Sequence, residues 1–391
     1  MKFEIERELL ATHLGRARDV AGRASTMPVL SNVLVRATQA ELGGRLFIGA
    51  SDLQSTVTAE IPANVMAPGS CMLDAKRIAE IVDSCAGDLV QVEVSPERVA
   101  DVRCGRPRFS LPTISDHEFP IVHAPGAWLK VNGAVLAECL GKVDFACAKD
   151  DTSRPWANGV LLRAAGDGKI VLLASNGSVI VQVLRKSGIQ AFGDAIIPKR
   201  GAADLASVLA GQKEAFISVT PSEIHARVGS VCVSSKLLEA KWPDVAPIFI
   251  GAEARKVIVN REALNAAISR MLIVSPADTG VVLDIDERRM HLESEAAGQG
   301  AADEDIPCDC VGTGVVLAVK GQLMKDVIGR MDTEQVEIHY GFGEDAQKIA
   351  RNEPDRIIVR PAGSENQASA VGTLRLEVYR TNSRTPPAAA A

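Results

Sequence analysis

Two cysteines and a run of acidic residues close to residue 310 are the side chains best placed to bind a metal ion. Cys308 and Cys310 flank Asp309, and three further carboxylates precede them at 303–305. Thiolate sites usually combine two cysteine pairs at wider spacing, and the sequence shows neither a second pair nor a neighbouring histidine. Alternation along a β-strand explains the spacing of the two cysteines. We therefore expect a strand here and no metal site.

The histidines and the glycine-rich sequences do not indicate catalysis. The six histidines lie in six different predicted elements, and none shares a motif with a serine or cysteine nucleophile. The segment 312–314 reads Gly-Thr-Gly but lacks the later glycine of a dinucleotide-binding turn, and no P-loop is present. The sequence predicts a protein that is not an enzyme and that needs no cofactor.

Composition favours a folded chain of several domains. Of the 391 residues, 47% are hydrophobic and 24% are charged, which is typical of globular proteins. The longest uncharged run, 170–184, is too short to cross a bilayer, and the first residues lack the apolar core of a signal peptide. The eight cysteines are scattered through apolar stretches, as expected of reduced thiols. We expect a cytoplasmic protein with no membrane partner.

An internal repeat organises the elements that carry these residues. Each copy begins with a strand and an amphipathic helix, continues with a hairpin and a second helix, and closes with paired strands. The three hairpins begin at Asn32, Asn158 and Gly280, so the period is roughly 120 to 126 residues. The sequence therefore predicts three tandem repeats at 1–125, 126–252 and 253–381, followed by a disordered tail at 382–391.

Charge separates by element, although the whole chain carries a net charge of −6. The six predicted helical segments hold 16 Lys and Arg against 11 Asp and Glu, so the rest of the chain is strongly acidic. These segments are 6–23, 74–84, 131–149, 198–213, 260–271 and 320–331. Lys and Arg are good helix formers, which is one explanation. The other is a positive helical surface that follows a nucleic-acid backbone.

Residues in all three repeats carry a resemblance that runs over nearly the whole chain. They include 22–35, Ser51-Asp52-Leu53 and 105–120 in the first repeat, and 154–162, 196–201 and 234–244 in the second. In order and spacing these segments resemble the bacterial DNA polymerase III β subunits, the replicative sliding clamps. The resemblance implies an α+β DNA clamp fold in which each repeat packs two helices on antiparallel sheets. It also implies a homodimeric ring that encircles double-stranded DNA and serves as a processivity factor.

The resemblance also implies which residues meet DNA and which join two protomers. The implied DNA contacts are Arg23, Arg154, Trp156, Lys199 and Arg200, which would touch phosphates weakly and read no bases. Ordinary solvated charges are the alternative for these positions. At the dimer interface, the resemblance pairs Phe109 and Leu111 with Ile273 and Val274 of another protomer. A buried strand pair within one chain is the alternative there.

Family members bind the short peptides of DNA polymerase and clamp-loader subunits in a hydrophobic pocket, and this chain departs from the family pattern there. The family sequence Thr-Asp-Gly-His-Arg-Leu is replaced by 175–180, which keeps only the glycine, and the C-terminal Met-Pro-Met-Arg-Leu is replaced by roughly 374–378. Thr279 stands where an arginine that reaches toward DNA is expected. The implied pocket residues are Ser175, Gly177, Ser178, Val179, Ile180, Pro243, Ile248, Leu374 and Leu376.

Two functions follow from this pattern. The first is a processivity factor that tethers the replicative polymerase, which the retained interface and loop residues favour. The second is a clamp-derived paralogue that acts as a specialised protein-interaction scaffold, which the altered pocket favours.

Overall fold

The computed structural model describes residues 1–23, 27–40, 43–120, 125–189, 192–249, 255–275, 280–312, 314–341 and 354–374. The chain forms two compact units: unit 1 comprises 1–138 and 187–239, and unit 2 comprises 139–186 and 240–391. The predicted tail and Leu376 lie outside the described residues. Within the described residues, no helix is both long and apolar enough to cross a membrane.

Unit 1 contains a small antiparallel sheet whose last strand has one free edge. Its strands, in spatial order, are β5 (Asn64–Ala67), β1 (Lys2–Glu6), β7 (Leu89–Val94), β8 (Val99–Arg103) and β9 (Arg108–Pro112). Alternation in β1 buries Phe3 and Ile5, as a strand with one face on a core requires. Among the described strands, β9 pairs only with β8.

The larger sheet of unit 1 joins strands from the first two repeats. Its order is β10 (Leu129–Val131), β15 (Ala215–Val219), β16 (Glu223–Val228), β17 (Val231–Lys236), β4 (Ser55–Pro62), β3 (Gly43–Ser51), β2 (Asn32–Ala40) and β6 (Gly69–Asp74). The repeats meet where β4 pairs with β17, with Val57 opposite Val233. Both valines are buried, so this ladder belongs to the core.

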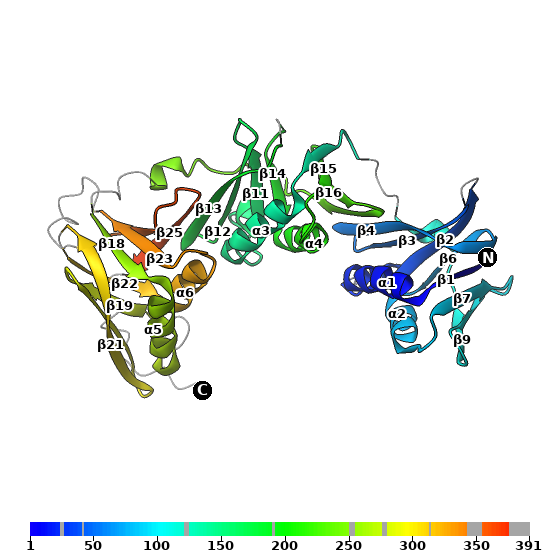
Figure 1. The fold of residues 1–391 in the computed structure, drawn as a ribbon, viewed down its shortest axis with the longest axis horizontal. Coiled ribbons are helices and arrows are strands. Elements are labelled where there is room, and N and C mark those ends of the chain that lie inside the picture. Colours follow the sequence, from blue (N-terminus) through cyan, green and yellow to red (C-terminus); the bar gives the residue numbers. More distant parts are fainter. Residues whose placement is uncertain are drawn as a thin grey trace. The chain divides into compact units, whose positions relative to one another are not determined.

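Helices cover one face of this sheet. α1 (Arg7–Ala21) packs on β2, β3 and β4 and against α2 (Ala75–Ser84), and α4 (Lys199–Leu209), which follows β14 (Ala195–Pro198), packs on β16 and β17. Figure 1 shows α1 and α4 on the same side of the sheet. In α1, Leu10, Leu14, Ala17 and Ala21 are buried at the three- and four-residue spacing of one helical face.

Unit 2 is built around a third antiparallel sheet. The strands run in the order β11 (Gly159–Ala164), β12 (Lys169–Ser175), β13 (Val179–Lys186), β25 (Gln367–Leu374), β22 (Val315–Lys320), β19 (Gly280–Ile285), β20 (Arg289–Ala296), β21 (Gly300–Val311), β18 (Arg255–Asn260), β23 (Gln335–Tyr340) and β24 (Arg356–Pro361). β24 also pairs with β25, and the second and third repeats meet where β13 pairs with β25.

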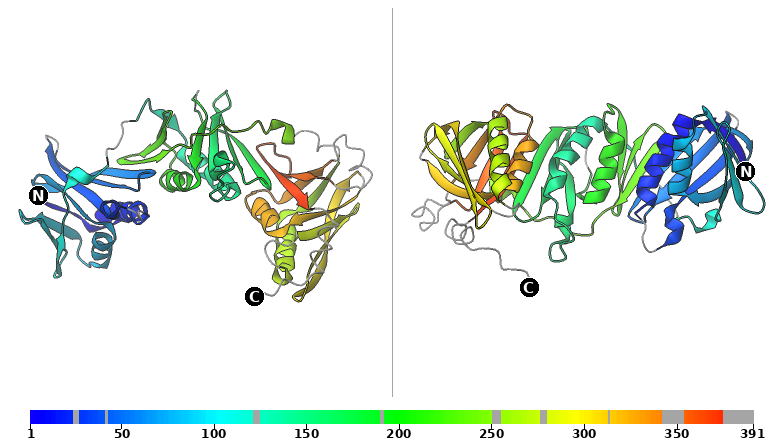
Figure 2. Two further views of the ribbon diagram at one scale, coloured as in Figure 1. Left: turned by 180° about the vertical axis from the view of Figure 1, so that it is seen from behind. Right: turned by 90° about the horizontal axis from the view of Figure 1, so that it is seen from below.

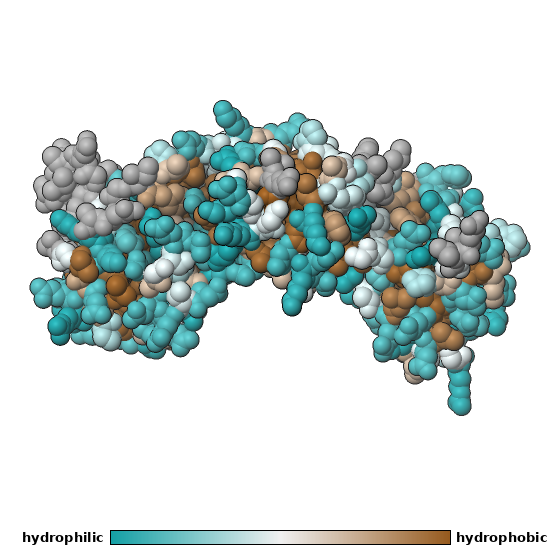
Figure 3. Space-filling view, turned by 45° about the horizontal axis from the view of Figure 1, so that its top comes forward, coloured by the Kyte–Doolittle hydropathy of each residue, from teal (hydrophilic) through white to brown (hydrophobic). Residues whose placement is uncertain are grey.

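Two helices pack together in unit 2, and a third belongs to both units. α5 (Arg261–Val274) lies against β20 and β21 and packs beside α6 (Gly321–Gly329), as Figure 2 shows. α3 (Gly133–Val143) begins in unit 1 and ends in unit 2. Each predicted repeat therefore supplies two of the described helices. On the face drawn in Figure 3, hydrophobic residues form separate areas among mainly hydrophilic ones.

Candidate nucleic-acid, peptide and protomer interfaces

Arg23 follows α1 and is fixed by an ion pair. Its guanidinium donates two hydrogen bonds of 2.7 Å to the carboxylate of Asp204 on α4, and Asp52 lies 4.0 Å away. Hydrogen bonding to the carboxylate of Asp204 raises the pKa of Arg23. Both groups are partly buried, and their ion pair joins the end of α1 to α4. Much of the hydrogen-bonding capacity of Arg23 is therefore used inside unit 1.

Lys199 and Arg200 are the first two residues of α4, and their charges are free. Arg200 is exposed and Lys199 is half-buried, and neither forms an ion pair with the described residues. Gly201 brings this end of the helix against β17, because a Cβ there would collide with Ser235. The positive end of the helix dipole adds to the two charges. This helix start can attract phosphate groups.

Arg154 contacts the turn of the predicted peptide pocket. Its guanidinium is 2.7 Å from the carboxylate of Asp151, and a Cβ on Gly177 would overlap it. Hydrogen bonds from Ser153 and Arg154 lower the pKa of Asp151 to about 2, so the partner of Arg154 stays ionised. The structure thus brings a residue predicted to meet DNA together with Gly177. Sequence spacing gave no sign of this contact, because 23 positions separate the two residues.

Trp156 packs inside unit 2. It lies in the short helix Pro155–Asn158 and makes an edge-to-face contact with Trp242, at 4.9 Å between ring centroids. Trp242 is only 5% exposed and directly precedes Pro243, which is exposed. This contact anchors the chain on which Pro243 lies. Trp242 is a supporting residue that the sequence analysis missed.

The turn before β13 explains the glycine of the predicted pocket. The backbone N–H of Gly177 donates to Ser175 Oγ at 3.1 Å, and Asn176 Oδ1 accepts from the N–H groups of Ser178 and Val179. Gly177 has φ of 87°, a conformation that favours glycine. This backbone geometry disfavours a side chain at position 177, and the guanidinium of Arg154 occupies the space that its Cβ would need.

An apolar cluster follows this turn, across the junction of β13 and β25. Ile180 lies opposite Ala370, and Ile180, Ile248 and Phe249 pack against Ile358, Ala368 and Ala370. The carbonyl of Ile248 accepts a hydrogen bond of 2.9 Å from Arg356 Nε, which fixes this segment. The structure therefore brings the predicted residues Ile180 and Ile248 together. It adds Phe249, which the sequence analysis did not single out.

The remaining pocket residues are placed differently. Val179 is 1% exposed and belongs to the core, whereas Ser178 is half-buried beside the turn. Leu374 packs in another cluster, with Val282, Val316 and Ala318. Leu374 is the last residue of β25, which pairs there with β22.

The residues predicted at the protomer interface lie on the edge strand β9 and near the end of α5. Phe109 and Leu111 are half-buried on the edge strand β9 and alternate with exposed neighbours. Hydrogen bonds from Arg108 and Ser110 lower the pKa of Asp101 on β8, so the flanking charges are paired. In unit 2, Ile273 near the end of α5 is 79% exposed, and Val274 is half-buried.

The cysteines and carboxylates near residue 310 are engaged in other contacts. Cys308 and Cys310 lie on β21 as expected, and Cys310 Sγ is 3.3 Å from the hydroxyl of Tyr340. Burial raises the pKa of Cys308 to about 11. Glu304 forms two hydrogen bonds with Arg270, and Asp305 lies 2.7 Å from His291.

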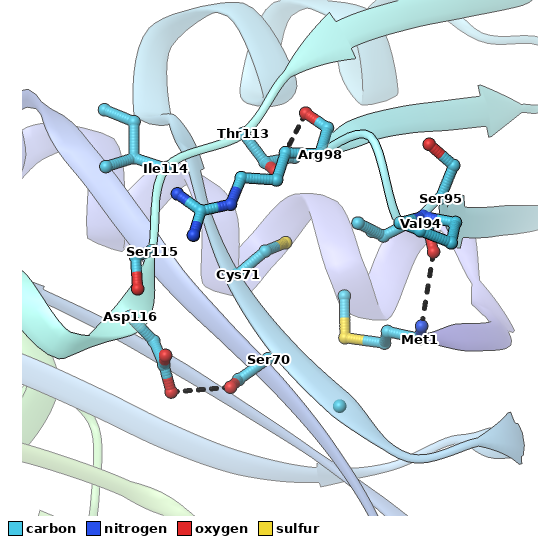
Figure 4. A pocket seen from close by; sticks show the side chains of 12 residues that line it. Met1, Ser70, Cys71, Val94, Ser95, Arg98, Thr113, Ile114, Ser115 and Asp116 are labelled. Atoms are coloured by element: carbon cyan, nitrogen blue, oxygen red, sulfur yellow. Dashed lines mark hydrogen bonds between the residues drawn. The ribbon is translucent and has the colours of Figure 1, made fainter.

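Figure 4 shows a cavity of about 350 Å³ in unit 1. Ser70 donates a 2.6 Å hydrogen bond to Asp116 at its wall, which lowers the pKa of that carboxyl. The guanidinium of Arg98 lies near Ile114 on the other side. Burial raises the pKa of Cys71, which also lines the cavity, to about 12. None of the residues predicted to bind DNA, peptide or protomer lines it.

Comparison with known proteins identifies the family. Three domain models of the DNA polymerase III beta subunit match in order: the N-terminal domain over 1–123, the central domain over 130–244 and the C-terminal domain over 249–356. The chain belongs to this family. Beta sliding clamps of Pseudomonas putida and Pseudomonas aeruginosa are each 27% identical to it, over 96% of this chain and 100% of the relative.

Solved structures agree with this assignment. The Pseudomonas aeruginosa sliding clamp bound to griselimycin superposes with a TM-score of 0.87 at 25% identity, over 96% of this chain and 100% of that chain. The Bacillus subtilis clamp has the same TM-score at 18% identity, with 96% and 99% covered. The predicted three-repeat α+β clamp fold is therefore confirmed. The chain is a non-catalytic processivity subunit of DNA polymerase III, as predicted.

Proposed function

We propose that this beta subunit forms a cytoplasmic homodimeric ring around duplex DNA and holds DNA polymerase through a short peptide. The same peptide site serves the clamp-loader subunits. The apolar cluster of Ile180, Ile248 and Phe249 carries this proposal, because it lies beside the Gly177 turn at the junction of two repeats. It provides apolar surface for leucine and phenylalanine side chains of a partner.

Recognition at this cluster is predominantly apolar. The family's histidine and arginine are replaced by Ser178 and Val179, and Val179 is buried. Arg154 is the cation nearest the Gly177 turn in the described structure, and it is paired with Asp151. Peptide affinity should therefore depend weakly on salt, because little free charge lies at the turn.

DNA contact in this proposal relies on α4. Lys199 and Arg200 carry free charge, whereas Arg23 is paired with Asp204. A ring that slides must hold phosphates weakly, and a few unpaired cations at a helix start are suited to that task. Arg23, Arg154 and Trp156 would then support the surface from inside their units.

Protomer contact in this proposal relies on β9. An edge strand presents unpaired N–H and C=O groups that can pair with another chain. Phe109 and Leu111 lie on this edge, and the exposed Ile273 is an apolar side chain that a second protomer would cover together with Val274. These features support a head-to-tail dimer through strand addition.

Anisotropy with a labelled peptide tests the peptide site directly. We expect the family-type sequence Gln-Leu-Ser-Leu-Phe to bind with Kd of roughly 1 to 10 μM, about −7 to −8 kcal/mol. Ile180→Asp should weaken binding at least about tenfold, because it places a charge among apolar groups. Met66→Asp, at an exposed apolar position of β5, is the matched control and should bind as the unmodified protein does. Equal binding by the two variants, or none at millimolar peptide, would refute the assignment.

A further inference from the structure

The turn at the junction between the first two repeats has the same pattern of hydrogen bonds and the same backbone conformation as the Gly177 turn. In unit 1, the N–H of Leu53 donates to Ser51 Oγ at 3.2 Å, and Asp52 Oδ1 accepts from the N–H groups of Gln54 and Ser55. Leu53 has φ of 71°, so it takes the same left-handed conformation as Gly177. The strand that follows, β4, pairs with β17 as β13 pairs with β25. The two junctions are therefore equivalent in backbone.

Their side chains differ at the equivalent positions. Thr56 lies opposite Ser234 on the first junction, where the second has Ile180 opposite Ala370. Thr58 lies opposite Cys232 in the next outward pair. Val57 and Ala59, which alternate with the two threonines, are buried. The first junction thus presents hydroxyl groups and a thiol where the second presents apolar groups.

These side chains line a cavity of about 270 Å³ within unit 1. Its walls are Thr56, Thr58, Pro125, Trp128, His225, Arg227, Cys232 and Ser234. Pro125 and Trp128 lie just before β10, so this part of the chain covers the cavity side of the sheet. The volume is about that of one or two amino-acid side chains and lies just below the usual range for small-molecule pockets, roughly 300 to 1,000 Å³. It fits a peptide side chain better than a large cofactor.

Arg227 determines which ligand group the cavity can bind. Its guanidinium lies 4.5 Å from the ring centroid of Trp128 and 5.1 Å from that of Phe216. These cation–π contacts hold the group in place. No carboxylate of the described residues pairs with it, and the nearby Glu223 lies 3.4 Å from His225 Nε2. A fixed guanidinium without an anion is a binding site for a carboxylate, which it can hold through two parallel hydrogen bonds.

We propose that this cavity is a second peptide-anchoring site, selective for an apolar or aromatic side chain that is followed by an acidic residue. The side chain packs on Trp128, and the carboxylate binds Arg227. The choice of a peptide over another carboxylate rests on the proposed function of the equivalent junction, where a peptide binds beside the Gly177 turn. The acidic preference rests on Arg227 alone.

Two labelled peptides with amidated ends test the acidic preference: Ser-Gly-Leu-Phe-Asp and Ser-Gly-Leu-Phe-Asn. We expect the acidic peptide to bind about tenfold more tightly, because only its carboxylate accepts charge-assisted hydrogen bonds from Arg227. Arg227→Met should abolish this difference. Arg227→Lys should retain part of it, because lysine keeps the charge but loses the planar two-point geometry. Equal binding of the two peptides, or a preference that survives in Arg227→Met, overturns the proposal.

Two further measurements separate this site from the other junction and from a simple anion site. Ile180→Asp should weaken binding of Gln-Leu-Ser-Leu-Phe at least about tenfold and leave the acidic preference intact. The acidic preference should be present even if the proposed function is wrong and Gln-Leu-Ser-Leu-Phe does not bind at the second junction. Loss of the acidic preference in Ile180→Asp would place the acidic peptide at the second junction and overturn the proposal. Sodium acetate should compete only at far higher concentration than unlabelled acidic peptide. If acetate competed as well as unlabelled acidic peptide, the cavity would be a site for small anions in general. This result would also overturn the proposal.

Discussion

Single side chains in this protein join segments that are distant in sequence. Arg23 and Asp204 are 181 positions apart, yet they form two hydrogen bonds in a partly buried place. Arg154 and the Gly177 turn make a similar contact in unit 2. The sequence predicts a surface role for each arginine. The partners of the two arginines could not be predicted, because the motif around a residue does not show which distant residue approaches it.

The ion pair of Arg23 should contribute measurably to the stability of unit 1. Arg23→Met leaves a largely buried carboxylate without its partner, so we expect the free energy of unfolding to fall by about 2 kcal/mol. Urea unfolding followed by circular dichroism measures this change. In a double-mutant cycle with Asp204→Asn, the coupling energy should exceed about 1 kcal/mol.

Lys130 provides the control for this prediction. It pairs with Glu214 at 2.7 Å, but both side chains are more than half exposed. Lys130→Met should therefore cost less than about 1 kcal/mol. If Arg23→Met cost no more than Lys130→Met, Arg23 would be free enough to serve chiefly as a phosphate contact.

At the scale of elements, periodicity predicted much of the fold. The predicted helical segments 74–84 and 198–213 contain α2 and α4, because the apolar spacing of a helix with one buried face is a local property. The positions of helix ends are predicted less accurately. The sequence predicts one helix over 131–149, yet α3 ends at Val143 and a short 3-10 turn, Asp144–Ala146, follows.

The pairing of strands from different repeats could not be predicted from the sequence. Alternation shows which face of β4 or β13 is buried, but it does not show which strand lies alongside. The pairs β4–β17 and β13–β25 join strands that are distant in sequence. For the same reason, the sequence could not show that Leu374, a predicted pocket residue, packs with Val282 and Val316 where β25 pairs with β22.

The edge strand β9 carries the prediction on protomer contact. Phe109→Asp places a charge where we expect a second protomer to cover an apolar side chain, so dimers should dissociate. Light scattering at micromolar concentration should then give the mass of one chain, 41.4 kDa. Leu89→Asp, at a 51% exposed position of β7 in the same sheet, is the control and should remain dimeric. A dimeric Phe109→Asp variant would place the interface elsewhere.

At the scale of the whole molecule, the sign of charge belongs to elements rather than to the chain. The net charge of −6 would argue against DNA contact, but the predicted helical segments carry more Lys and Arg than Asp and Glu. Lys199 and Arg200 lie side by side at the start of α4 and form no ion pair with the residues that the structure describes. DNA contact by a protein of this composition depends on where charge lies rather than on its sum.

Charge reversal at α4 tests the DNA contact. Lys199→Glu with Arg200→Glu should weaken binding to a labelled duplex, measured by anisotropy from about 20 to 200 mM salt. The slope of log affinity against log salt should become shallower by roughly 2, because two phosphate contacts are lost. Lys169→Glu with Lys186→Glu, a cross-strand pair on β12 and β13, makes the same change in charge and should leave the slope unaltered. Equal effects from both pairs would mean that only net charge matters.

The two junction ladders also have a mechanical consequence. The first and second repeats are joined by five residue pairs between β4 and β17, and five pairs likewise join β13 to β25. A force that pulls neighbouring repeats apart must break these backbone hydrogen bonds together, whereas a flexible linker would simply extend. At each junction the two repeats therefore share load through a ladder of paired strands, and neither junction can act as a free hinge.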